Sequence, residues 1–131
     1  MKIAVFENQF EDIKGAFEFA NLLSFDGNLE IKIFPRSQDC DLETISIFDV
    51  IFIDIDLSKK SELDGYGLVK KLQELEGDLL NRIVILTGHS KIKDTMIHRG
   101  IDDERIKIVI KPTDFEELTD VINEVITGTT M

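Results

Sequence analysis

The sequence predicts an α/β fold: a doubly wound sheet of five parallel strands in the order 2-1-3-4-5, with helices on both faces. Apolar runs of strand length alternate along the chain with segments whose apolar residues recur at helical spacing. Residues 29–34 alternate between apolar and charged side chains, which is typical of an edge strand, whereas residues 50–55 are almost all apolar, as in a strand buried on both faces. Together with the handedness of crossover connections, these patterns favour the stated order.

The elements follow one another along the chain. Strands are predicted at residues 2–6, 29–34, 48–56, 82–86 and 105–110, and the partial alternation of the last one fits the opposite edge of the sheet. Helices are predicted at residues 10–23, 68–75, 91–99 and 115–125. A short helix using Leu42 and Ile45 is expected within residues 37–47. Asp114, with Glu117 three residues later, is expected to cap the last helix.

Length and composition predict one soluble domain covering residues 1–131. The formal net charge is −11, which argues against direct binding of nucleic acid or anionic membranes and suits a metal cation or a basic protein partner. Cys40 is the only cysteine, so an intramolecular disulfide is excluded. The first apolar run is too short for a signal peptide and no stretch approaches membrane-spanning length, so a cytoplasmic location is expected.

Polar side chains stand where the predicted strands end. Because the carboxyl ends of parallel strands share one edge of a sheet, residues distant in sequence should meet there: Glu7, Asn8, Asp54, Asp56, Thr87 and Lys111. Oxygen-rich side chains at such an edge suit Mg²⁺. An aspartate beside a bound cation can attack a phosphoryl group, while a hydroxyl and an ammonium hold the phosphoryl oxygens. We therefore expect Asp54 to be the reacting group.

These residues resemble the receiver domain of two-component response regulators, the CheY-like (βα)5 branch of the flavodoxin-like folds. The similar features are the acid after the first strand, the aspartate that ends VIFID, and then Asp64-Gly65, ILTG and IKP. Each motif is weak alone, but all occur in the expected order over essentially the whole chain.

The resemblance implies a phosphoprotein in a phosphorelay rather than an enzyme acting on a separate substrate. It implies that Asp54 accepts a phosphoryl group from a sensor histidine kinase or histidine phosphotransfer protein, and that Thr87 and Lys111 engage this group. Mg²⁺ would lie near Glu7, Asn8, Asp54 and the backbone carbonyl of Asp56. The resemblance also implies a cis peptide bond at Lys111-Pro112 and a partner or homodimer surface on the fourth helix, fifth strand and fifth helix, roughly residues 91 to 126.

Three departures from the family pattern bear on these expectations. Asn8 stands where the family usually has a second acid, so Mg²⁺ should bind more weakly than in a two-acid site. The loop between Asp54 and Asp64-Gly65 is longer than usual and lacks the customary proline. Ile108 occupies the position where the family often has an aromatic switch residue.

Two alternatives remain open. The departures suit a pseudo-receiver, a protein-interaction module that works without phosphorylation. Asp54, Asp56 and Ser58 also imitate the DxDx[ST] motif of haloacid-dehalogenase-type phosphatases, which have it on the first strand of a longer chain. Asp56 could instead face solvent and contribute only its carbonyl, and His89 is expected to face solvent.

Overall fold

The sheet has the predicted topology. The computed structural model describes residues 1–57, 59–101 and 104–128. Its five strands are parallel and ordered β2-β1-β3-β4-β5. They are β1 (Lys2–Phe6), β2 (Glu30–Phe34), β3 (Val50–Asp54), β4 (Ile83–Thr87) and β5 (Lys107–Ile110). The connections reverse direction between β1 and β3, and open α/β sheets bind ligands at such a point.

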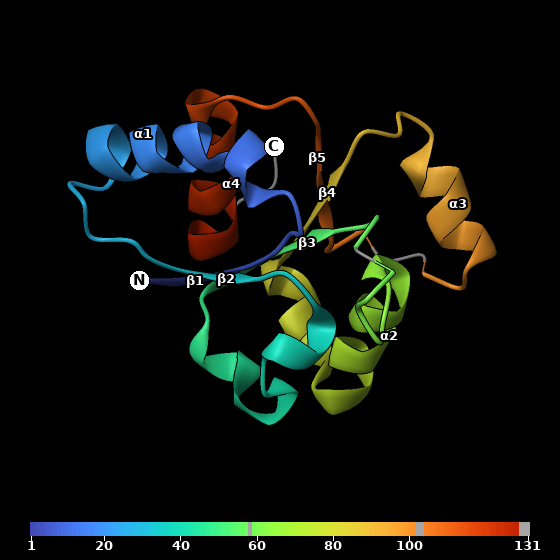
Figure 1. The fold of residues 1–131 in the computed structure, drawn as a ribbon. Coiled ribbons are helices and arrows are strands. Elements are labelled where there is room, and N and C mark those ends of the chain that lie inside the picture. The colour runs from blue at the N-terminus through green and yellow to red at the C-terminus, as the bar shows by residue number, and fades with distance from the viewer. Residues whose placement is uncertain (58, 102–103, 129–131) are drawn as a thin grey trace.

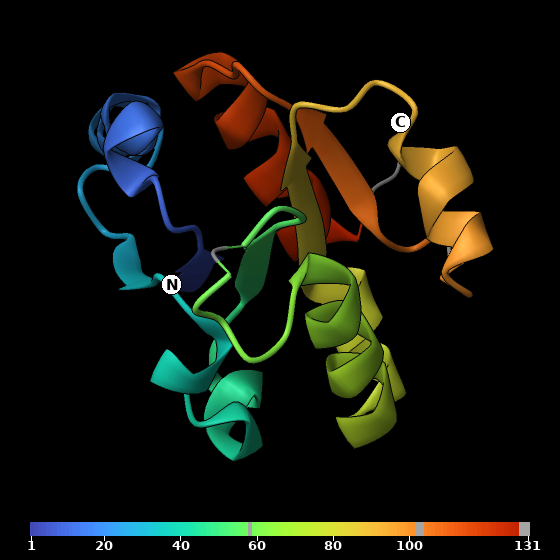
Figure 2. The same cartoon turned by 45° about the vertical axis from the view of Figure 1, so that its right-hand side comes forward.

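Helices cover both faces of the sheet. The α-helices α1 (Lys14–Ser24) and α4 (Phe115–Thr127) lie on one face, and α2 (Gly65–Leu75) lies on the other (Figure 1). The helix α3 (Ile92–His98) lies beside β5, as the turned view shows (Figure 2). Two further 3-10 segments are η1 (Phe10–Asp12) and η4 (Gly77–Arg82).

The short helix expected within residues 37–47 is present as two 3-10 segments, η2 (Ser37–Asp39) and η3 (Leu42–Ile47). Leu42, Ile45 and Phe48 recur at intervals of three, which matches the three residues per turn of a 3-10 helix. Ile45 and Phe48 are buried, and Leu42 packs against the same core. Asp41 begins η3 by accepting a hydrogen bond from the Glu43 N–H at 3.1 Å.

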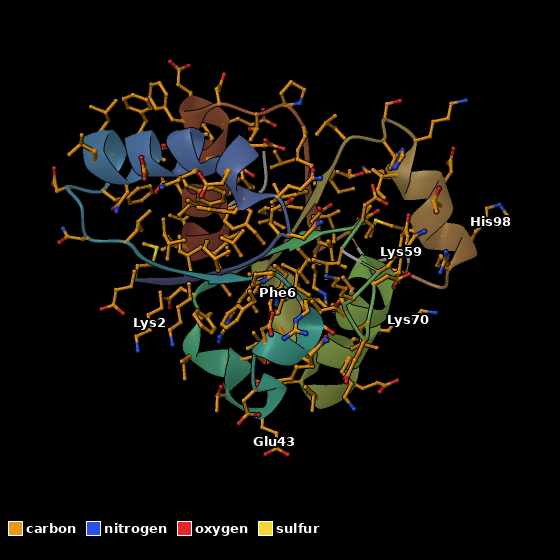
Figure 3. The ribbon with its side chains drawn as sticks, in the orientation of Figure 1. Lys2, Phe6, Glu43, Lys59, Lys70 and His98 are labelled. Carbon is orange, nitrogen blue, oxygen red and sulfur yellow. The ribbon has the colours of Figure 1, made fainter. Side chains whose placement is uncertain are left out.

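Side chains from the two faces of the sheet form two layers of core. All five residues of β3 are buried, which confirms the prediction of a strand covered on both sides. On the α1 and α4 side, the rings of Phe17 and Phe52 meet edge to face with centroids 5.1 Å apart. On the opposite side, Phe6 is fully buried and lies near the centre of the molecule (Figure 3). The buried strand β3 therefore holds its terminal aspartate in a fixed position.

Side-chain caps begin two of the helices. Asp64 accepts a hydrogen bond from the Gly67 N–H at 2.7 Å, and Asp114 accepts one from the Glu117 N–H at 2.9 Å, as predicted for the last helix. The Lys111-Pro112 bond is cis, in agreement with the expectation. Within the described part of the chain, no helix is both long enough and apolar enough to cross a membrane.

Candidate functional site

Four of the predicted site residues meet at the carboxyl edge of the sheet. Glu7 follows β1, Asp54 ends β3, Thr87 ends β4 and Lys111 follows β5. Glu7, Asp54 and Thr87 are 1%, 3% and 0% exposed, which is rare for polar side chains unless they are paired. The Lys111 N–H donates a hydrogen bond of 2.7 Å to the Thr87 carbonyl. The predicted convergence of these residues is confirmed.

The Lys111 ammonium lies between the two buried carboxylates. Its Nζ atom is 3.3 Å from Glu7 Oε2 and 3.5 Å from Asp54 Oδ2. The Lys111 side chain is 25% exposed, so its charge is partly screened from solvent while the carboxylates are almost wholly screened. One cation thus faces two anions in a region of reduced dielectric, where charges interact more strongly than in water.

Burial and the neighbouring aspartate together raise the pKa of Glu7 to about 7. The largest cause is the burial of Glu7, followed by the negative charge of Asp54 and a hydrogen bond with the Asp54 side chain. The Lys111 charge and the Gln9 N–H, which donates to Glu7 Oε1 at 3.1 Å, act in the opposite direction. Near neutral pH, therefore, a proton on Glu7 relieves the repulsion from Asp54 that Lys111 only partly offsets.

Backbone contacts fix the orientation of Asp54 and Thr87. The Asp56 N–H donates to Asp54 Oδ1 at 3.0 Å, which leaves Oδ2 facing Lys111. The Thr87 hydroxyl accepts a hydrogen bond of 3.1 Å from the His89 N–H. Both side chains are therefore held by the residues that follow them, and neither depends on a long flexible side chain.

The side chains of Asn8 and Asp56 lie at the exposed margin of this cluster. Asn8 is exposed, in contrast to the adjacent Glu7. The side chain of Asp56 is 65% exposed, and its Oδ2 atom lies 3.1 Å from His89 Nε2, whose side chain is equally exposed. The alternative in which the Asp56 side chain faces solvent is thus confirmed, and so is the expected exposure of His89.

The donor set suits a hard dication. The carboxylates of Glu7 and Asp54 both lie within 3.5 Å of the Lys111 ammonium, and carboxylate oxygens are ligands that Mg²⁺ prefers. Burial, followed by the negative charge of Asp54, raises the pKa of Glu7, and a bound dication would act in the opposite direction. No group of three or more histidine, cysteine, aspartate or glutamate side chains is arranged to hold a metal within residues 1–57, 59–101 and 104–128. A metal here would therefore rely on two buried carboxylates, with backbone or water oxygens completing its coordination.

The resemblance to haloacid-dehalogenase-type phosphatases finds little support. Its motif belongs on the first strand, whereas Asp54 ends the third strand in sequence. The second aspartate of the motif, Asp56, is exposed and paired with His89. Ser58, its third member, lies outside the described residues.

Comparison of the sequence with protein-family models and with curated proteins finds no match. Solved structures do match. The receiver domain of NtrX from Brucella abortus superposes with a TM-score of 0.70 at 22% identity, covering 97% of this chain and 99% of that domain. The receiver domain of the sensor histidine kinase PA1611 from Pseudomonas aeruginosa PAO1, whose structure has magnesium coordinated in its active site cleft, gives 0.72 at 17% identity, covering 96% of this chain and 97% of that one. The chain has the receiver-domain fold of response regulators.

The matched chains differ in length. A CheY-like receiver domain protein from Methanospirillum hungatei JF-1 has a TM-score of 0.71 and 16% identity, with 97% of this chain and 94% of that one covered. In contrast, the chain spans only 27% of a longer NtrX chain from Brucella abortus, at 22% identity and a TM-score of 0.71.

The sequence analysis missed two features around the cluster of Glu7, Asp54, Thr87 and Lys111. The first is the structural reason for the glycine in Asp64-Gly65: a Cβ atom at Gly65 would lie 2.4 Å from Ile55 Cα and 2.6 Å from the Asp54 carbonyl oxygen. The glycine of the Asp64-Gly65 pair therefore allows the start of α2 to pack directly against the backbone of Asp54. The second is a hydrogen-bonded contact between η2 and the loop after β3, which has no periodic signal in the sequence.

Proposed function

We propose that this chain is a receiver domain that accepts a phosphoryl group on Asp54 from a sensor histidine kinase or a histidine phosphotransfer protein, and that it switches partner binding in response. The observation that carries the proposal is the position of the Lys111 ammonium between the buried carboxylates of Glu7 and Asp54. A buried carboxylate beside a fixed ammonium is suited to phosphoryl transfer, which depends mainly on positioning and charge stabilisation. The proposal includes the cytoplasmic location expected from the sequence.

The reaction needs few groups. An Asp54 carboxylate oxygen attacks phosphorus, the bond from phosphorus to the donor's imidazole nitrogen breaks, and its electron pair remains on that nitrogen. Lys111 is placed to hold a phosphoryl oxygen, and the Thr87 hydroxyl at the end of the adjacent strand can donate to another. Glu7 and Asp54 would hold Mg²⁺, with Asn8 and the Asp56 carbonyl as the further expected contacts. The chemistry supplied by the bound ion would be neutralisation of the phosphoryl charge.

The proposed partner surface includes a groove between α3 and β5. The groove has a volume of about 370 Å³ and is lined mainly by apolar side chains, among them Met96 and Ile97 of α3, Ile108 of β5, and Ile106, which directly precedes β5. Ile97 is 55% exposed, which leaves apolar surface available to a partner or a second copy of the chain. Phosphorylation at Asp54 would act by shifting the population of loop arrangements after β3 and β4.

Intact mass spectrometry tests the proposal. The protein is incubated with Mg²⁺ and phosphoramidate, a small phosphodonor, beside an Asp54→Asn variant. A phosphoryl adduct on the wild type that is absent from the variant supports phosphorylation at Asp54. Absence of an adduct with any donor, including a histidine phosphotransfer protein, would favour the pseudo-receiver, for which the exposed amide of Asn8 in place of a second acid is the favouring observation.

A further inference from the structure

We infer that a hydrogen-bonded clasp between residues 37–38 of η2 and residues 60–63 of the loop after β3 positions the backbone around Asp54 for phosphoryl transfer. This inference rests on the proposed function. The two segments are 22 to 26 residues apart in sequence at their contacts. They lie side by side in both ribbon views (Figures 1 and 2).

Ser37 forms the buried half of the clasp. Its backbone N–H donates to Ser61 Oγ at 2.8 Å, and its own hydroxyl accepts from the Leu63 N–H at 3.0 Å. The Ser61 hydroxyl donates in turn to the Leu63 carbonyl at 2.6 Å. Ser37 is only 2% exposed, so these bonds are shielded from competing water.

Gln38 forms the exposed half. Its Nε2 donates to the Lys60 carbonyl at 2.8 Å, and its Oε1 accepts from the Glu62 N–H at 2.9 Å. One side-chain amide therefore satisfies two backbone groups of the loop, in the way that a neighbouring strand would. The Gln38 Oε1 atom also accepts from the Ser37 hydroxyl at 3.3 Å. Because Gln38 itself is exposed, replacing it changes the clasp without opening a cavity in the apolar core.

Both ends of the clasped loop touch Asp54. At the start of the loop, the Asp56 N–H donates to Asp54 Oδ1 at 3.0 Å. At its end, the Gly65 N–H donates to the Ile55 carbonyl at 3.3 Å, and Gly65 packs against the Asp54 carbonyl. A change in the path of the loop would therefore move groups that orient the reacting carboxylate.

The clasp restricts the conformations of the loop after β3, whose sequence lacks the customary proline. A loop without regular structure has many conformations, and only those that keep the backbone near Asp54 in place suit the reaction. Gln38→Ala removes the hydrogen bonds that the Gln38 amide makes with the Lys60 carbonyl and the Glu62 N–H. A hydrogen bond of ordinary net strength corresponds to roughly a fivefold change in an equilibrium.

The test compares wild type, Gln38→Ala and Asn21→Ala. Asn21 is a comparable control because its amide also bridges two backbone groups: it donates to the Leu29 carbonyl and accepts from the Leu29 N–H, at the opposite end of β2 from Asp54. The rate of adduct formation is measured by intact mass with Mg²⁺ and limiting phosphoramidate. Mg²⁺ binding by the unphosphorylated proteins is measured by titration calorimetry, and stability by urea denaturation.

We expect Gln38→Ala to be phosphorylated roughly fivefold more slowly and to bind Mg²⁺ more weakly by a similar factor, with Asn21→Ala matching the wild type in both. Gln38→Glu, which keeps the acceptor for the Glu62 N–H, should be intermediate. Equal rates and Mg²⁺ affinities for wild type and Gln38→Ala would overturn the clasp and leave the proposed function standing. Equal slowing in Gln38→Ala and Asn21→Ala would overturn it too, since general stability would then explain the effect. Absence of an adduct on the wild type would overturn both.

Discussion

Replacing Glu7 by glutamine should change how the stability of the metal-free protein depends on pH. The folded protein raises the pKa of Glu7 from 4.5 to about 7, mainly through burial and then through the negative charge of Asp54. The folded state therefore binds this proton more tightly than the unfolded chain does. The resulting stabilisation is fully present below pH 4.5 and is lost as the pH rises through about 7.

The size of the effect follows from the two pKa values. Each pKa unit corresponds to about 1.4 kcal/mol, so the interval from 4.5 to about 7 corresponds to about 3 kcal/mol of unfolding free energy. Glu7→Gln keeps the shape of the side chain and has no proton to lose in this range. The variant and the wild type should have similar stability near pH 4.5, and the variant should be more stable by about 3 kcal/mol at pH 8.

Urea denaturation in EDTA from pH 4.5 to 8.5 measures this difference. Glu43→Gln is a suitable control because it makes the same chemical change at an exposed glutamate on η3, which projects outward in Figure 3. Its difference from the wild type should stay constant across the range. A constant difference for Glu7→Gln as well would refute the conclusion that the folded protein raises the pKa of Glu7.

Three further predictions concern the surroundings of the site. Gly65→Ala should lower the unfolding free energy by about 3 kcal/mol in urea denaturation, because the added Cβ would lie 2.4 Å from Ile55 Cα and backbone cannot easily move away. Gly15 lies in α1, and a Cβ atom there would meet nothing within 4 Å, so Gly15→Ala should raise the unfolding free energy by roughly 0.5 kcal/mol. Similar results for the two variants would contradict the packing explanation. Asn8→Asp should tighten Mg²⁺ binding roughly tenfold in titration calorimetry by adding a negative charge, and an unchanged affinity would count against a metal site at this position. Because Ile108 replaces the aromatic switch residue, structures with and without a phosphate analogue should show no ring moving between buried and exposed positions on β5, and such a movement would disprove this expectation.

Most of the fold could be predicted because its strands carry two opposite patterns. The almost entirely apolar run of residues 50–55 indicates a central strand, and the alternation in residues 29–34 indicates an edge. Together with the handedness of crossovers, these patterns favour the observed strand order. The segment 37–47 is harder to predict because its apolar residues are few and recur at intervals of three. This is the spacing of a 3-10 helix, and 3-10 helices are too short to give a clear periodic pattern in a sequence. The sequence therefore predicts a short helix at the correct position, but not that the segment forms two 3-10 helices.

The candidate site could be predicted in part for the same reason. Glu7, Asp54, Thr87 and Lys111 stand at strand ends, and parallel topology alone brings strand ends together. The pairing of Asp56 with His89 and the clasp through Gln38 could not be predicted, because hydrogen bonds between loops depend on the path of the backbone. Their residues carry no periodic signal.

The charges of the cluster explain why its buried position is compatible with phosphorylation. With Glu7 and Asp54 both ionised, the single positive charge of Lys111 leaves the cluster with one net negative charge, which would repel a phosphoryl donor. A proton on Glu7 removes that charge but leaves nothing to attract the donor. A dication in its place would give the cluster a net positive charge and would keep both carboxylates ionised, including the nucleophile. The raised pKa of Glu7 and the proposed requirement for Mg²⁺ thus have one cause, a second carboxylate buried beside the one that reacts.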